Sequence, residues 1–62
     1  MYKGMRLSIM KKRAMNEYGE GIKPVKGRTW EGCLTREYKS HGKKDFWVLW
    51  FNDGENIRAI SD

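Results

Sequence analysis

Hydrophobic and polar positions follow the clearest pattern in the C-terminal part of the chain. Residues 45–52 contain six consecutive apolar residues, mostly aromatic or β-branched, with a polar residue at each end. Asp53-Gly54 follows directly. Such a run followed by turn residues predicts a strand that leads into a tight turn. Residues 56–61 again contain spaced apolar positions, and they predict a short closing strand.

Two segments nearer the N-terminus alternate less completely. Residues 29–38 predict a half-exposed strand in which Gly32 marks a bend, and residues 39–44, rich in Lys with Ser and Gly, predict the loop of a hairpin. Residues 4–9 alternate cleanly and predict a first strand. Its inward positions would be Met5, Leu7 and Ile9.

Residues 10–28 separate these predicted strands. Residues 10–18 are compatible with a short helix capped by Gly19, but the segment is shorter than a helix that is stable alone, and loop residues follow it. We therefore expect a long basic loop, with one helical turn as the alternative. The whole pattern predicts an all-β fold, a small antiparallel barrel of four to five strands, forming a single domain over residues 1–62.

Several of these segments resemble one known group of domains. The segments are 4–9, 30–34 and 48–55, together with Ile57 and Ile60, and the pattern resembles the Src-homology-3-like small barrels, especially their Tudor and KOW branches. In Tudor-like domains an aromatic residue opens the second strand, and the third strand ends in an apolar-aromatic stretch followed by a turn such as Asp-Gly. The resemblance implies a barrel that binds a partner, and it says much less about which partner.

The resemblance also implies a possible aromatic cage. Tudor domains that bind methylated Lys or Arg hold the cation by cation–π attraction. Position by position, Trp30 and Phe51 resemble cage walls, and Asn56 resembles the polar residue at the rim. Gly54 stands where such cages often have an aromatic residue, so the sequence departs from the full pattern.

Length and cysteine content restrict the possible classes further. A chain of 62 residues buries only about 60% of its unfolded surface, so self-association as a homodimer is one way to gain stability. Cys33 is the single cysteine and His41 the single histidine, which excludes an internal disulfide and a zinc site within one chain. We expect no metal and no cofactor. A lone cysteine and the absence of a ~20-residue apolar run predict a cytoplasmic protein that does not enter a membrane.

Catalysis is not expected. His41 lies in a predicted loop without an orienting carboxylate, and Cys33 has no basic activator nearby in the sequence. We therefore expect a binding domain, not an enzyme, with no catalytic residues.

The net charge of +5 is unevenly distributed and suggests an anionic partner. Residues 1–29 contain eight Lys or Arg against two Glu, whereas residues 30–62 contain five against six acids. The first hypothesis is a nucleic-acid partner, either DNA or RNA. The predicted phosphate-contacting residues are Lys11, Lys12, Arg13, Lys23, Lys26, Arg28, Lys43 and Lys44.

The aromatic strand at 45–52 supports the same hypothesis and also an alternative. Alternate residues of a strand face opposite sides, and a barrel has one interior. One aromatic row should therefore face outward, unless residues 10–28 or another chain cover it. We expect bases to stack on an aromatic face of Trp30, Trp47 or Phe51. The alternative is a protein-interaction module, such as a small regulator or inhibitor that docks on a larger protein through this face.

Overall fold

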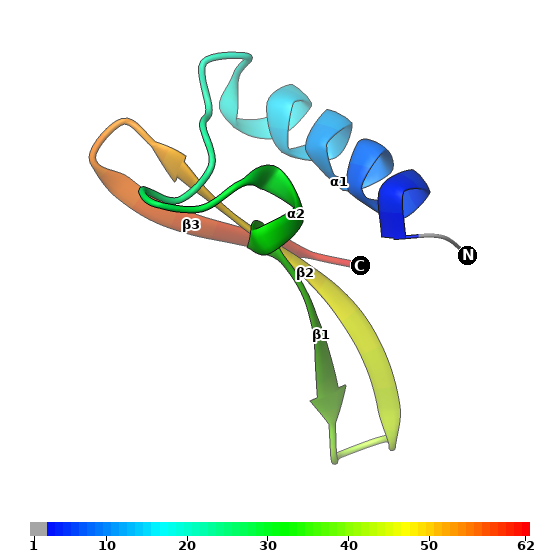
Figure 1. Ribbon diagram of the computed structural model, residues 1–62. Helices are drawn as coiled ribbons and strands as arrows, with labels where there is room; N and C mark the ends of the chain where they lie inside the picture. Colours follow the sequence, from blue (N-terminus) through cyan, green and yellow to red (C-terminus); the bar gives the residue numbers. More distant parts are fainter. Residues whose placement is uncertain (1–2) are drawn as a thin grey trace.

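The first element of the structure is a helix, not a strand. The computed structural model describes residues 3–62, and α1 spans Lys3–Tyr18 (Figure 1). Leu7, Met10 and Ala14 are buried on one side of it, at the spacing of a helical stripe. The helix ends at Gly19, which has a φ of +102° and whose N–H donates to the Met15 carbonyl at 2.8 Å.

This helix overturns the predicted first strand at 4–9 and the predicted long loop over 10–28. The alternation predicted that Met5, Leu7 and Ile9 are all buried. Of the three, Leu7 is buried, whereas Met5 is 58% and Ile9 40% exposed. The helical stripe that begins at Leu7 continues for two further turns, and no glycine or proline interrupts residues 5–18. The loop preferred for residues 10–18 was therefore wrong, and the alternative of a helix that ends at Gly19 describes this segment, although the helix begins earlier, at Lys3.

Three strands form an open antiparallel sheet in the order β1-β2-β3. β1 spans Leu34–Lys39, β2 spans Lys44–Asp53 and β3 spans Asn56–Ser61. The predicted strands at 45–52 and 56–61 are confirmed. The β2–β3 turn pairs Asp53 with Asn56 and contains Gly54 at a φ of +66°, a conformation that glycine adopts without strain.

The predicted strand at 29–38 is half wrong. Its first residues form a short helix, α2, spanning Trp30–Cys33. Thr29 is the N-cap residue of α2, and its side-chain oxygen accepts the Gly32 N–H at 3.2 Å. The all-β barrel is therefore replaced by a mixed α/β domain in which an open sheet has one helix-covered face.

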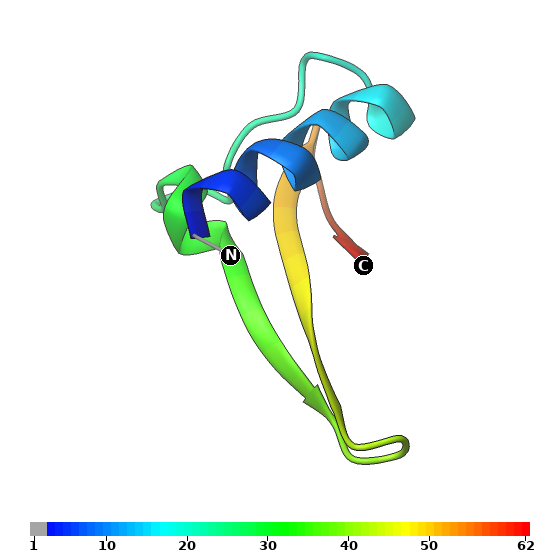
Figure 2. The same ribbon diagram turned by 90° about the vertical axis from the view of Figure 1, so that its right-hand side faces the viewer.

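The core lies between α1 and one face of the sheet, which we call the covered face. Buried residues from both helices, the loop and all three strands meet there. They are Leu7, Met10, Ala14, Ile22, Cys33, Leu34, Leu49, Phe51 and Ile60. The two views of the ribbon place α1 across one end of the sheet, and the distal half of the β1–β2 hairpin extends beyond both helices (Figures 1 and 2).

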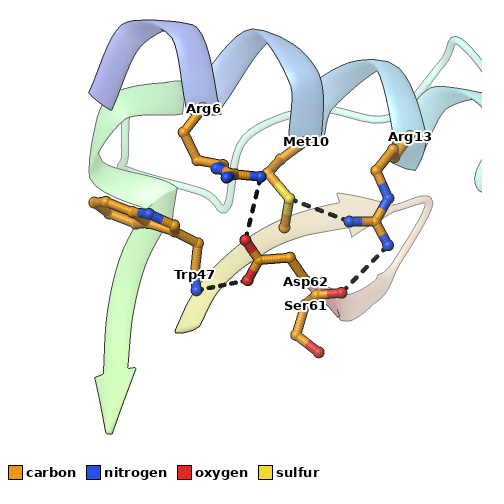
Figure 3. A network of polar contacts seen from close by, with 6 residues as sticks. All are labelled: Arg6, Met10, Arg13, Trp47, Ser61 and Asp62. Carbon is orange, nitrogen blue, oxygen red and sulfur yellow. Dashed lines mark hydrogen bonds and ion pairs between the residues drawn. The ribbon is translucent and has the colours of Figure 1, made fainter. Parts of the chain in front are cut away.

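A polar network holds α1 to the end of β3 (Figure 3). The Asp62 carboxylate pairs with Arg6 at 3.2 Å and also accepts the Trp47 main-chain N–H at 2.9 Å. Arg13 donates to the Ser61 carbonyl at 3.3 Å. Asp62 therefore links the helix to β2 just beyond the last paired residue of β3, since the β2–β3 register ends at Ser61.

Within residues 3–62, no helix combines the length and the apolar character that a membrane crossing requires.

Candidate nucleic-acid interface

The face of the sheet opposite α1, which we call the open face, is formed by alternate residues of each strand. The registers place Trp50 beside Ala59 and Phe46 beside Glu37. The residues of β2 on this face are Lys44, Phe46, Val48, Trp50 and Asn52. The neighbouring strands contribute Thr35, Glu37, Lys39, Ile57, Ala59 and Ser61.

Trp50 is the largest exposed apolar side chain of this face, with 38% of its surface accessible. Its indole N–H donates to the Thr35 hydroxyl at 3.2 Å, and that hydroxyl lies 3.4 Å from the Val48 carbonyl, to which it donates. These bonds fix the orientation of the indole ring on the sheet. Trp50 therefore presents a positioned aromatic surface to solvent.

Cations lie at the hairpin end of the open face. Lys39 and Lys44 are direct partners in the β1–β2 register, and both are exposed. The Lys39 ammonium lies 5.8 Å from the centroid of the half-buried Phe46 ring. Lys43 belongs to the hairpin turn itself, where it is exposed and has a φ of 51°. A shallow pocket at this end includes Lys39, Lys44 and Phe46 in its lining.

More cations lie at the opposite end of the same face. Arg28 lines a shallow pocket with Val25, Trp50 and Ile57. An adjoining pocket beside Asn52 is lined by further residues of the loop that follows α1. These include Lys23, Pro24 and Lys26. The loop is fixed to the sheet because Lys23 and Asn52 exchange both main-chain hydrogen bonds, at 2.7 and 3.0 Å.

Acidic groups near the open face are few and mostly paired. Glu37 lies on this face beside Phe46 and is exposed. Asp45 faces the other side of β2 and pairs with Arg36 at 3.5 Å. The open face thus combines two aromatic rings with cations at both ends and one acid, Glu37. Asp45 and Asp62, which are paired with Arg36 and Arg6, also line the pocket at the hairpin end.

The predicted basic cluster on residues 11–13 does not join this surface. Consecutive helical residues point about 100° apart, so the three side chains diverge. The Lys11 ammonium lies 4.9 Å from the Trp30 ring, Lys12 is exposed, and Arg13 donates to Ser61. Because these residues lie on α1, they are on the helix side of the sheet. Of the predicted cations, the structure gathers Lys23, Lys26, Arg28, Lys43 and Lys44 at the ends of the open face.

The predicted aromatic residues also lie away from the open face. Phe51 is 0% exposed and packs against Tyr18, with ring centroids 5.1 Å apart. Trp47 lies on the covered face beneath the Arg36 guanidinium at 4.9 Å, and Trp30 lies in α2. A cage built on Trp30 and Phe51 is therefore absent from this arrangement. The row that faces outward is the other one, which contains Phe46 and Trp50.

Known proteins give no guide to this surface. Comparison of the chain with protein-family models, with curated proteins and with solved structures found no match.

The nucleophilic and metal-binding groups of residues 3–62 form no second site. Cys33 is fully buried, and its sulfur accepts the Val25 N–H at 3.3 Å. His41 is exposed in the β1–β2 turn. No cluster of three or more His, Cys, Asp or Glu side chains occurs in this part of the chain.

Proposed function

We propose that the protein binds single-stranded nucleic acid across the open face of its sheet. The observation that carries the proposal is the placement of two aromatic rings, Phe46 and Trp50, between cations at both ends of one uncovered face. Proteins that bind single strands combine stacking side chains with a positively charged track for the backbone. Double-stranded partners fit this surface less well, because their bases are already stacked on one another.

The dimensions of the face are suited to a short stretch of nucleotides. At ~3.3–3.4 Å per residue, β2 extends about 27 Å from Lys44 to Asn52. Lys39 and Lys44 would contact phosphates at one end, and Arg28, Lys23 and Lys26 would do so at the other. Such contacts position a strand without reading its sequence. A nucleic-acid partner also agrees with the cytoplasmic location expected from the lone cysteine.

The second candidate function is docking on a protein. It is favoured by the shallow pocket of Val25, Trp50 and Ile57, in which Ile57 is 62% exposed. Exposed apolar side chains of this kind mark interaction sites when they are contiguous. The two candidates differ in their response to salt, because phosphate contacts release counterions and weaken as salt rises, whereas an apolar interface is much less sensitive.

Fluorescence anisotropy with labelled single-stranded DNA, single-stranded RNA and duplex DNA tests the proposal. We expect salt-sensitive binding between about 50 and 200 mM salt, with single strands preferred. Replacement of Trp50 by Ala should weaken binding roughly 5- to 150-fold, the effect of losing one stacked base, while W50F should retain most of the affinity. Absence of binding at the lowest salt, or equal affinities of W50A and the parent protein, would contradict the proposal.

A further inference from the structure

The outer edge of β3 has main-chain N–H and C=O groups that point away from β2, and the sheet register shows which residues they belong to. The Asp62 N–H donates to the Trp47 carbonyl at 3.2 Å, so Asp62 and Trp47 are a hydrogen-bonded pair and the Asp62 N–H points toward β2. Hydrogen-bonded and non-bonded pairs alternate along antiparallel strands. The even-numbered residues of β3 therefore bond to β2, and the odd-numbered ones direct their N–H and C=O groups outward. These are Ile57, Ala59 and Ser61.

The contact of Arg13 supports this assignment independently. Its guanidinium reaches the Ser61 carbonyl at 3.3 Å, which requires that carbonyl to point away from β2. Within residues 3–62, no main-chain hydrogen bond from another element meets the Ile57 or Ala59 edge groups. β3 is thus a free edge over its central residues.

The two edges of the sheet differ in the features that prevent pairing with another strand. Edge strands are usually protected by charged side chains, especially lysine. Three of the six residues of β1 are charged, namely Arg36, Glu37 and Lys39. β3 has one charge, Arg58, and its guanidinium is held by Asp53 at 3.3 Å and lies 5.5 Å from the Tyr18 ring centroid. β3 is therefore the less protected of the two edges, although Arg13 reaches it at Ser61.

We propose that two copies of this chain form a dimer by antiparallel pairing of β3 with β3, about a two-fold axis at Ala59. This register places Ala59 opposite its own copy and Ile57 opposite Ser61, so the outward N–H groups of all three residues find acceptors. The Ser61 carbonyl, which already accepts from Arg13, would accept a second hydrogen bond on its other lone pair. A shift of the axis to Arg58 leaves Ser61 unpaired and puts two arginines opposite one another, which is unfavourable. The three residues that would meet across the axis are uncharged, so no like-charge repulsion opposes a second copy as the partner of this edge.

The dimer would join the two three-stranded sheets into one continuous sheet. The small side chain of Ala59 at the axis allows close approach, and Ile57, now 62% exposed, would gain cover at the junction. Chains of this length commonly gain stability by association. The proposal does not depend on nucleic-acid binding, and its test contains no nucleic acid.

Sedimentation velocity over a range of protein concentrations tests the dimer. We expect the parent protein to shift with concentration from the 7.4 kDa monomer to twice that mass. A59P removes an outward N–H while leaving the bonds to β2, and proline is tolerated on edge strands, so this variant should remain monomeric. Y38P is the matched control, because the Tyr38 N–H points outward on the β1 edge by the same register rule. It should still form dimers.

Two results would overturn the proposal. One is a parent protein that stays monomeric at every concentration, and the other is an A59P variant that dimerises like the parent. If circular dichroism shows that A59P is unfolded, the double variant I57K/S61K provides the test. It keeps every main-chain bond but places like charges opposite one another across the two-fold axis, so it should be folded and monomeric. A folded I57K/S61K variant that still dimerises would also contradict the proposed register.

Discussion

The two faces of the sheet differ although they are formed by the same strands. On the covered face, Leu49 and Phe51 are both 0% exposed beneath α1. On the open face, the neighbouring Trp50 is 38% exposed, although Val48 on the same face is buried. The residues alternate along β2 and are similarly apolar, so composition does not explain the difference. The apolar stripe of α1 can cover only one face, and the face that it leaves uncovered has the surface available for a partner.

The largest expected difference between the two faces is in stability, and alanine substitutions at two adjacent residues of β2 measure it. F51A should reduce the free energy of unfolding by about 3–5 kcal/mol, because it leaves a cavity in the core. A domain of this size has only about that much stability, so the variant should be largely unfolded. W50A should cost no more than about 1–2 kcal/mol, because its ring is already partly hydrated. Urea denaturation followed by circular dichroism measures both, and equal losses would remove the distinction between the faces.

A smaller effect is expected at the contact that holds α1 on its face. D62A removes both the partner of Arg6 and the acceptor of the Trp47 N–H, and it should cost about 1–2 kcal/mol in the same denaturation experiment. The control is D45A, which removes an exposed ion pair with Arg36. That change should alter stability by less than about 0.5 kcal/mol. A D62A variant as stable as D45A would show that the network does not help to fix α1.

Sequence reasoning identified what depends on local pattern. The apolar run at 45–52, the Asp53-Gly54 turn and the strand at 56–61 were predicted correctly, because strand and turn signals there agree. The alternation of side chains along 45–52 also predicted two opposite aromatic rows. Which row faces outward depends on where α1 packs, and this is a tertiary contact that no local pattern contains.

The errors have identifiable physical causes. Residues 4–9 fit both a strand and a helix, and the deciding stripe of Leu7, Met10 and Ala14 appears only over a longer window. At Trp30–Cys33 the side-chain oxygen of Thr29 favours a helical start that the alternation obscured. Once residues 3–18 are helical, three strands remain, too few to close a barrel. The cations on residues 11–13 then belong to the helix side and not to a groove.

The central claim is that the open face, and not the helix side, binds the phosphates of a single strand. The most direct measurement compares K39E/K44E with K11E/K12E in anisotropy titrations of labelled single-stranded DNA or RNA. Both variants change the net charge equally, so a difference between them reports where the strand lies. We predict that K39E/K44E lowers affinity at least about tenfold, while K11E/K12E lowers it only about two- to threefold through net charge. Equal losses, or the larger loss in K11E/K12E, would contradict the account.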